Sequence, residues 1–231
     1  MFNNVRWRNF NENQKITRFI TNFYHNNPGY LHYGLTEINY ETLKAKDGYT
    51  SERITLNTHT STHVDAPYHH FPNGKTIAQT PIESYIGSAV VIDLFDIEAH
   101  TAIGVEHLEP YADKIKEGDI ILLCTGWGYK RNWTTEYVDN WPYLGIDGAQ
   151  WLHDRKVKGI AIDSLSIGGP RVGEGLEQHE LLLGAEIWLA EELFLPKELL
   201  EYDRWDFMFL PLKLEGCGGA PGRAIAFISE D

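Results

Sequence analysis

The feature that most constrains this chain is the stretch from His59 to His70, which reads HTSTHVDAPYHH. Three imidazoles and one carboxylate fall within eleven residues of it, at His59, His63, Asp65 and His69. Imidazole nitrogen and carboxylate oxygen are ligands that suit zinc, manganese or iron, and no cysteine competes with them here. A histidine-rich surface loop is the alternative. So many donor groups in so short a stretch favour a catalytic metal site instead.

The spacing of these donors limits the local conformation. In a straight strand, His59 and His63 would lie about 13 Å apart at roughly 3.3 Å per residue, too far for two ligands that each sit about 2 Å from one ion. A helix would bring them together, but the β-branched residues between them and the following Pro67 disfavour a helix. We therefore predict a bend in which His59 ends a strand, residues 63–65 curl back over the ion, and His69 lies near it.

Composition indicates the class of protein. With 231 residues, of which 42% are hydrophobic and 23% charged, we expect one globular domain over residues 1–231. The formal net charge of -13 argues against nucleic-acid and anionic-membrane partners, which bind basic patches. Two cysteines make no disulfide framework. The opening MFNNVRWRNF lacks the apolar run of a signal peptide, and no stretch approaches the roughly 20 apolar residues of a membrane span, so we expect a cytoplasmic protein.

Short apolar runs alternate with helical patterns along the chain. The runs at 89–94, 120–124 and 159–163 predict buried strands. Helical spacing predicts helices over 105–116 and 148–157, the second with Asp147 as its N-cap candidate. Shorter helical segments are predicted at 81–85 and 196–202, and further strands at 53–57, 187–189, 207–210 and 224–228. The strand at 53–57 would lead straight into the metal stretch. This alternation indicates an α/β fold with a largely mixed sheet.

Polar and aromatic side chains follow two of these strands. Ligands gather beyond the carboxyl ends of strands in open α/β sheets, so Trp127 is a candidate for substrate binding, with packing as an equal alternative. Asp163 and Ser164 stand at the end of another strand and are further candidates. The aromatic segment 129–146 predicts an excursion over a substrate, a dimer contact or a satellite core. The glycine-rich segment 166–175 lacks the lysine of a phosphate loop and predicts a flexible loop.

A second pair of donor groups lies far along the chain, at His179 and Glu191. On one continuous helix these residues would be about 18 Å apart. The segment HELLL (179–183) favours a helix, Gly184 is a natural C-cap, and a strand is predicted just beyond it. A reversal at Gly184 would return Glu191 close to His179, although Glu192 is an equal rival on composition.

The stretch HTSTHVDAPYHH resembles the HxGTHxDxPxH signature of the cyclase-like metal-dependent hydrolases, the family that includes bacterial kynurenine formamidase and isatin hydrolase. Ser61 stands where the family usually has glycine, so a positive φ there would be costlier. The family also carries a histidine before a leucine-rich turn and a glutamate twelve residues on, which matches His179 and Glu191 rather than Glu192.

A third segment, LKLEGCGGAPGR (212–223), resembles the family's glycine-rich GxDGxPxR stretch near the substrate pocket. Gly218 replaces the usual acid, Ala220 replaces the frequent serine, and Arg223 is kept. The missing polar groups could alter substrate contacts. Cys217 lies in the same segment but has no local signature of a catalytic nucleophile.

The resemblance implies a swivelling β/β/α architecture whose mixed sheet is partly curled into a barrel. It implies one or two zinc or manganese ions per subunit, the first held by His59, His63 and Asp65 and the second by Asp65, His179 and Glu191. Asp65 would then bridge the ions. It also implies a homodimer or homotetramer, and an N-terminal segment that helps to wall the substrate pocket. The tyrosines among residues 1–50 are candidates for that wall, and the sequence does not choose among them.

The implied activity is hydrolysis of an amide C–N bond, in the manner of an arylformamidase. Water activated by the metal would attack the carbonyl, and His69 would be the general acid/base. The substrate would be a small aromatic amide or lactam, such as an N-formylkynurenine-like or isatin-like compound, with contacts to Trp127, Asp163, Ser164 and Arg223. The alternatives are an isatin-type lactam hydrolase, a polyketide-type cyclase or lyase, and a metal-stabilised binding protein without turnover.

Overall fold

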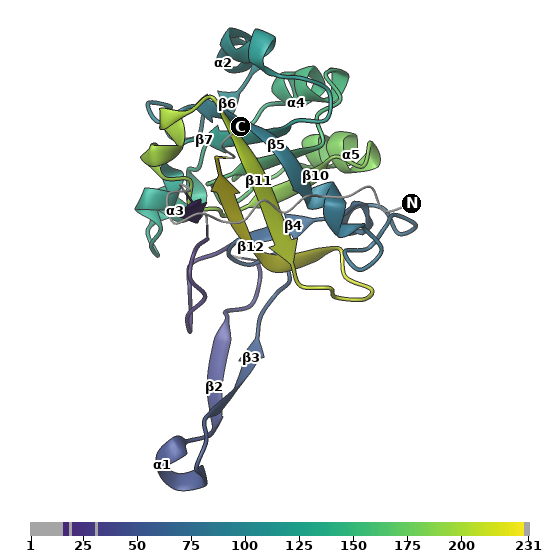
Figure 1. Ribbon diagram of the computed structural model, residues 1–231. Coiled ribbons are helices and arrows are strands. Elements are labelled where there is room, and N and C mark those ends of the chain that lie inside the picture. The colour runs from purple at the N-terminus through teal and green to yellow at the C-terminus, as the bar shows by residue number, and fades with distance from the viewer. Residues whose placement is uncertain (1–15, 19, 31, 229–231) are drawn as a thin grey trace.

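The computed structural model describes residues 16–18, 20–30 and 32–228 (Figure 1). The first ten residues, which bear on the expectation about a signal peptide, lie outside these ranges. Within the described ranges the main sheet has eight strands. They are β1 (Ile16–Arg18), β4 (His63–Asp65), β5 (Ile86–Asp93), β7 (Ile120–Cys124), β9 (Gly159–Ile162), β10 (Trp188–Glu191), β11 (Arg204–Pro211) and β12 (Gly219–Phe227).

Seven of these strands close into a barrel. The pairing runs β12-β11-β5-β7-β9-β10-β4, and β4 then pairs with β12 again, while β1 lies against the far end of β12. The pairings β5–β7, β7–β9 and β9–β10 are parallel, and the other pairings of the ring are antiparallel. The predicted mixed, barrel-like sheet is therefore confirmed.

Helices connect the parallel strands and cover one side of the sheet, where Figure 1 shows α2, α4 and α5 together. The α-helices are α1 (Lys44–Asp47), α2 (Val105–Leu108), α3 (Thr135–Asp139), α4 (Ile146–Asp154) and α5 (Leu176–Gly184). The 3₁₀ helices are η1 (Pro67–His69), η2 (Ile82–Tyr85), η3 (Glu109–Lys114), η4 (Trp127–Lys130) and η5 (Lys197–Glu201). None of the helices in the described part of the chain has the length and apolar character that crossing a bilayer requires.

Two hydrophobic cores lie on the two faces of the sheet. In β7, Ile120 and Leu122 belong to the core inside the barrel, whereas Ile121 and Leu123 belong to the core beneath the helices. Successive residues of a strand point to opposite faces, so a strand buried on both faces reads as an unbroken apolar run. This is why the runs at 89–94, 120–124 and 159–163 predicted the central strands correctly.

The predicted helices differ from the observed ones in detail. The helix predicted over 105–116 is α2 followed by η3, because Pro110 in the first turn of η3 provides no backbone N–H for a continuous α-helix. The helix predicted over 148–157 is α4, which starts earlier and has Gly145 as its N-cap. Asp147 instead lies inside α4, and its carboxylate accepts a hydrogen bond from the backbone N–H of Val105.

A narrow arm projects from the barrel (Figure 1). It consists of β2 (Glu37–Thr42) and β3 (Ser51–Thr55), joined through α1. Its apolar side chains are mostly in solvent: Tyr40 is 65% exposed, Tyr49 62% and Ile54 56%. The strand predicted at 53–57 belongs to this arm and ends at Thr55, so it does not lead straight into the metal stretch. A further two-stranded pairing joins β6 (Ala102–Ile103) to β8 (Tyr143–Leu144).

Candidate metal centre

The first half of the site is a turn followed by a strand. Residues 58–62 turn, with Ser61 at a left-handed φ of 56°, and residues 63–65 then form β4. The prediction that His59 ends a strand and residues 63–65 curl over the ion is therefore wrong, and the order is reversed. Alternation along β4 places His63 and Asp65 on one face and Val64 in the barrel core on the other. The turn returns the ring of His59 to the carboxylate of Asp65, with His59 Nδ1 2.7 Å from Asp65 Oδ1.

The second half comes from α5 and β10. After α5 the chain reverses at Glu186, which has a left-handed φ of 61°, and enters β10. The helix ends with Gly184 in its last turn and Ala185 as its C-cap, so the cap differs from the predicted one. The predicted return is nonetheless present, because His179 Nε2 lies 3.3 Å from Glu191 Oε1. In the ladder between β10 and β4, Glu191 is opposite His63.

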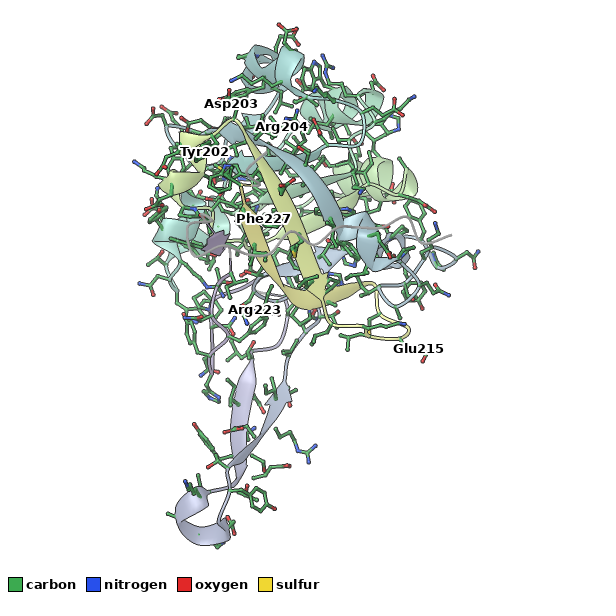
Figure 2. The ribbon with its side chains drawn as sticks, viewed as in Figure 1. Tyr202, Asp203, Arg204, Glu215, Arg223 and Phe227 are labelled. Atoms are coloured by element: carbon green, nitrogen blue, oxygen red, sulfur yellow. The ribbon has the colours of Figure 1, made fainter. Side chains whose placement is uncertain are left out.

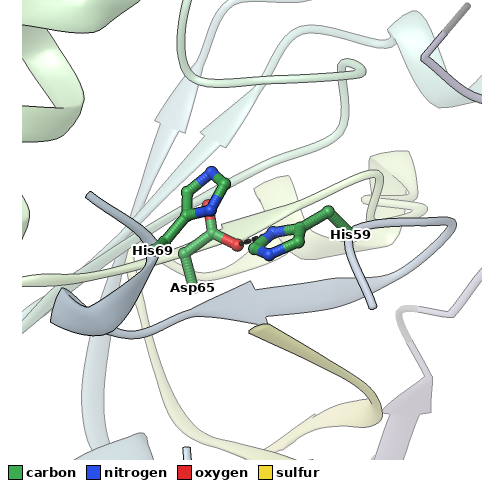
Figure 3. A group of neighbouring side chains, drawn as sticks. All are labelled: His59, Asp65 and His69. Atoms are coloured by element: carbon green, nitrogen blue, oxygen red, sulfur yellow. Dashed lines mark hydrogen bonds and ion pairs between the residues drawn. The ribbon is translucent and has the colours of Figure 1, made fainter. Parts of the chain in front are cut away.

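Six side chains with metal-ligating atoms therefore meet at one place. The donor atoms of His59, Asp65 and His69 lie within 4.8 Å of one another, and those of His63, Asp65 and Glu191 do so as well. Figure 3 shows the first group, with both imidazoles beside the carboxylate of Asp65. His179 adjoins the second group, since its Nε2 is 3.9 Å from Asp65 Oδ2. Asp65 is common to both groups, and its Oδ1 lies 2.7 Å from His59 Nδ1 and 3.5 Å from His63 Nε2.

Hydrogen bonds to the backbone fix the orientation of two of the histidines. His63 Nδ1 lies 2.7 Å from the carbonyl oxygen of Ser61, and His179 Nδ1 lies 2.7 Å from that of Gly175. Each Nδ1 donates its proton to a carbonyl, so each Nε2 faces the cluster with its lone pair available when the ring is neutral. Glu191 is held in turn by Ser166 Oγ at 2.9 Å and by the backbone N–H of Ile167 at 2.7 Å, both donating to Oε1.

The residues fit a divalent cation. His63 Nε2 and Asp65 Oδ2 are fully buried, and neither has a hydrogen-bond partner among the described residues. Buried polar atoms are almost always hydrogen-bonded, so two such atoms in one cluster require a reason. A cation among imidazole nitrogens and carboxylate oxygens provides one, because it takes the lone pairs that no proton donor reaches.

The charges in the cluster are strongly coupled. Burial lowers the pKa of His63, but Glu191 and Asp65 outweigh burial and raise it to about 9. The same balance raises the pKa of His179 to about 9. Burial disfavours the charged form of Glu191, yet its contacts with His179 and His63 hold the pKa of its carboxyl well below the usual range. The carboxylates therefore attract positive charge strongly, either as protons on these imidazoles or as a metal ion.

His69 differs from these ligands. Burial lowers its pKa to about 4, and Asp65 offsets this only in part. Its ring stacks on that of His59, with centroids 3.9 Å apart. His69 follows Pro67 in η1 and lines the cavity beside the cluster. A neutral imidazole at neutral pH is thus placed between the candidate ligands and open space.

A cavity of about 350 Å³ opens onto the cluster. His59, His69, His179 and Glu191 form its floor, Tyr30, Tyr33, Trp141 and Leu165 contribute aromatic and apolar wall, and the loop 166–175 closes one side. Arg171 of this loop is exposed and also lines the cavity. The loop predicted to be merely flexible is therefore part of the cavity wall, and this volume fits a small aromatic molecule.

Four residues expected near the substrate lie outside the cavity lining. Trp127 is buried in the same cluster as Trp141, and its indole N–H donates to the carbonyl of Tyr137. Asp163 is fully buried and accepts from the backbone N–H and the hydroxyl of Thr125, while burial raises its pKa to about 6. Ser164 is buried and donates to the carbonyl of Ser166. Arg223 is exposed on β12, opposite Leu210 of β11 (Figure 2).

The glycines of the 212–223 segment approach the site closely. A Cβ at Gly218 would lie 2.7 Å from the Cα of His69, and one at Gly219 would lie 2.5 Å from the His59 ring. The carbonyl of Gly218 also accepts from the backbone N–H of Ala66 at 2.7 Å. An acid at position 218 would displace His69, so the departure from the family pattern matches the packing of this chain.

The sequence identified the ligand-type residues better than it identified the walls. Tyr30 and Tyr33 line the cavity, whereas Tyr40 and Tyr49 lie on the arm, and no local pattern distinguishes these pairs. Trp141 was marked only as part of an aromatic excursion. Ser166, which supports Glu191, carried one signal: it follows a buried strand that ends in an acid.

Comparisons with known proteins agree with this geometry. The family described as "Putative cyclase" matches residues 8–168. A kynurenine formamidase from Bacillus anthracis is 30% identical over 195 residues, which is 83% of this chain and 88% of that protein. Isatin hydrolase A from Labrenzia aggregata has the same fold, with a TM-score of 0.84 at 21% identity over 94% of both chains. A structure described as a predicted metal-dependent hydrolase from Bacillus stearothermophilus gives a TM-score of 0.77 at 27% identity, covering 93% of this chain and 98% of that one.

Proposed function

Because the chain belongs to the cyclase family, we propose that it is a metal-dependent hydrolase of amide C–N bonds, with a kynurenine formamidase-like activity on small aromatic amides. One observation carries this proposal. Two buried ligand atoms without hydrogen-bond partners, His63 Nε2 and Asp65 Oδ2, lie in a cluster that forms the floor of an aromatic cavity.

We propose that His59, His63, Asp65, His179 and Glu191 hold one or two divalent ions. Imidazole and carboxylate donors suit zinc and manganese equally, so either is a candidate. A divalent ion bound here would polarise an amide carbonyl and acidify water, the two steps that amide hydrolysis needs near pH 7. Ser166 and the backbone N–H of Ile167 hold Glu191 in place by donating to its Oε1.

His69 is the proposed general acid/base. Its neutral imidazole lines the cavity and has no carbonyl or carboxylate hydrogen bond among those found in the described residues, so it can accept a proton from the attacking water. It then gives that proton to the nitrogen as the C–N bond breaks, which releases an amine and a carboxylate. The alternative, that His69 is a metal ligand, is supported by its short distances to the donors of His59 and Asp65.

The substrate proposal rests on the cavity walls. Tyr30, Tyr33 and Trp141 offer aromatic surface to an aryl group, and Tyr33 keeps its proton because burial, Glu191 and Asp65 raise the pKa of its phenol. The hydroxyl of Tyr33 is thus a donor for a carbonyl oxygen. Trp127, Asp163, Ser164 and Arg223 are assigned no direct substrate contact, since none of them lines the cavity.

A substrate panel tests this proposal. The protein loaded with Zn²⁺ or Mn²⁺ is assayed with N-formylkynurenine, isatin and formyl-anilides, before and after chelation. We expect hydrolysis of the formyl amides, loss of activity on chelation and recovery when metal is restored. Turnover of isatin alone would assign a lactam hydrolase, and product without ¹⁸O from labelled water would assign a cyclase or lyase. Metal binding with no turnover of any compound would refute the enzyme assignment.

We further propose a cytoplasmic homodimer or homotetramer. The exposed apolar side chains of the arm support an assembly, because an isolated two-stranded hairpin is only marginally stable in water. Light scattering after size-exclusion chromatography measures the assembly directly, and a monomer at every concentration would contradict it.

A further inference from the structure

A buried network lies directly behind the candidate metal centre. Its central group is the guanidinium of Arg131, which follows η4 and has a side chain only 10% exposed. Arg131 Nη1 donates to Glu192 Oε2 at 2.7 Å, and Nη2 donates to Ser61 Oγ at 2.7 Å and to the carbonyl of Pro28 at 3.0 Å. Asn27 Nδ2 also donates to Ser61 Oγ, at 3.1 Å. One planar cation therefore joins three segments that are distant in sequence.

Two of these segments carry candidate ligands immediately beside the contact. Ser61 precedes His63 by two residues, and its carbonyl oxygen accepts the Nδ1 proton that orients the His63 ring. Glu192 directly follows Glu191. Both Ser61 and Glu192 have left-handed backbone, with φ of 56° and 52°. Residues other than glycine rarely adopt this backbone conformation, which persists only where neighbouring contacts hold it.

The backbone near Glu192 is held a second time. Thr62 Oγ1 donates to the carbonyl of Glu192 at 2.8 Å, and Thr21 Oγ1 approaches the same carbonyl at 3.3 Å. The two ligand segments are thus tied together through side chain and main chain. The contacts also explain the serine at position 61, because its hydroxyl accepts two hydrogen bonds that a glycine would leave unmade.

A gain in folding stability does not by itself explain why the Arg131–Glu192 ion pair is buried. Burying a guanidinium and a carboxylate costs desolvation energy that their attraction often fails to recover, and apolar replacements are frequently neutral or stabilising. In some proteins buried charged or polar groups instead specify one conformation. In this chain the conformation specified is that of the two turns which present His63 and Glu191.

We propose that Arg131 is a positioning residue of the metal centre, which holds Ser61 and Glu192 in their left-handed turns and so fixes the directions of His63 and Glu191. This inference rests on the metal centre of the proposed function. Arg131 does not line the cavity, and its hydrogen bonds within the described ranges reach no candidate ligand, so its effect on metal affinity passes through Ser61 and Glu192.

The test measures the affinity for Zn²⁺ or Mn²⁺ by competition with a chelating dye, together with the thermal midpoint of the metal-free protein. Arg131→Met alone leaves the carboxyl of Glu192 buried without its cation, so the test uses a double variant, Arg131→Met with Glu192→Met, which removes both members of the pair. We expect the double variant to bind metal on the order of 10- to 100-fold more weakly, the usual effect of losing a group that orients a ligand. Arg131→Lys should recover part of that loss, because one ammonium cannot bridge both partners as the fork does.

Arg204→Met is the matched control. Arg204 makes a two-pronged ion pair with Asp119 at 2.7 and 2.9 Å, near the start of β11 (Figure 2), and contacts no candidate ligand. Its loss should lower the thermal midpoint and leave metal affinity unchanged. A folded double variant with wild-type affinity would overturn the proposal.

Ser61→Ala provides a second measurement if the double variant does not fold. Alanine loses the hydroxyl that Arg131 reaches and, unlike glycine, keeps the cost of a Cβ at a left-handed φ. We expect metal affinity to fall several-fold, on the order of one lost hydrogen bond, and wild-type affinity in this variant would overturn the proposal. Wild-type protein that binds neither metal would instead refute the proposed function, which separates the two failures.

Discussion

Two short strands on either side of the turn at residues 56–62 have opposite surroundings. In β4 all three residues are buried, and both edges of the strand are paired, with β10 and with β12. In β3 four of the five residues are exposed, and within the described part of the chain the strand pairs with β2 alone. The difference shows that burial here depends on partners more than a hundred residues away, since β4 has them and β3 does not. Two of the candidate ligands, His63 and Asp65, lie on the strand that is paired on both edges.

The largest effect on metal binding and activity should come from replacing Asp65 on β4. Asp65→Asn removes the carboxylate that both donor groups share, so we expect bound metal to be lost and kcat/KM to fall on the order of 10³-fold or more, beyond what loss of an orienting group causes. Metal analysis and steady-state kinetics measure both. Asp154→Asn, on the exposed surface, is the control and should change neither. An Asp65→Asn enzyme with full activity would remove the metal centre from the reaction.

His69→Gln should have a smaller effect on turnover and little on metal. It removes the proposed general acid/base but none of the five proposed ligands, so kcat should fall by about 10²–10⁴-fold while the bound metal is retained. Metal content and kcat are measured on the same preparation. Loss of metal in parallel with activity would make His69 a ligand instead.

The pH dependence of metal binding follows from the raised pKa of His63 and of His179, each about 9. Both imidazoles must lose a proton to bind metal, so affinity should rise with pH up to about 9, with release of about one to two protons per binding event at pH 7.5. The stability of the metal-free protein should instead decrease as pH rises. The raised histidine pKa values contribute their full stabilisation below the pKa of the unfolded chain, near 6.5, and this contribution is lost as pH rises through about 9.

Calorimetry in buffers of different ionisation enthalpy measures the protons released, and thermal melts with and without metal measure stability. The gain in thermal midpoint on adding metal should therefore grow between pH 6.5 and 9. A gain that stays constant over this range would show that the two histidines bind metal without losing protons.

The smallest effect is expected on the arm. Ile54→Ser alters a side chain that is 56% exposed, so within a single subunit it should change the free energy of unfolding by less than about 0.5 kcal/mol and leave kcat unchanged. Melts at several protein concentrations check this. A larger loss that depends on concentration would show that the arm is buried between copies, and a loss independent of concentration would mean that the arm packs on its own barrel.

The same contrast explains what the sequence could predict. Strands that are buried on both faces read as unbroken apolar runs and were predicted well, including β5, β7 and β9. The conformation around His59 was predicted in reverse, because the register of β4 depends on residues 189–191 and 219–221, which no pattern within the stretch reveals. The candidate ligands were nonetheless predicted, because histidine and carboxylate side chains can be recognised in the sequence whatever the backbone conformation around them.

Residues that act through distant contacts were not predictable. Trp127 stands at the end of a strand, as a ligand-binding residue would, yet the helix α3 that follows provides the packing that buries it. Tyr30 and Tyr33 are indistinguishable in the sequence from the tyrosines of the arm. Glu191 and Glu192 are adjacent and identical in type, so the sequence does not distinguish them. In the structure Glu191 contacts His63 and is a candidate ligand, whereas Glu192 pairs with Arg131.

The closure of the barrel on β4 also constrains the order of events during synthesis. The strand that carries His63 and Asp65 leaves the ribosome well before both of its neighbours, β10 and β12, which lie more than a hundred residues further along the chain. Pairing across such a separation is slow, because a long loop must close before any contact forms. The nascent chain therefore holds an incomplete set of donors until β10, with Glu191, has been made, and a metal ion that arrives earlier meets only part of its site.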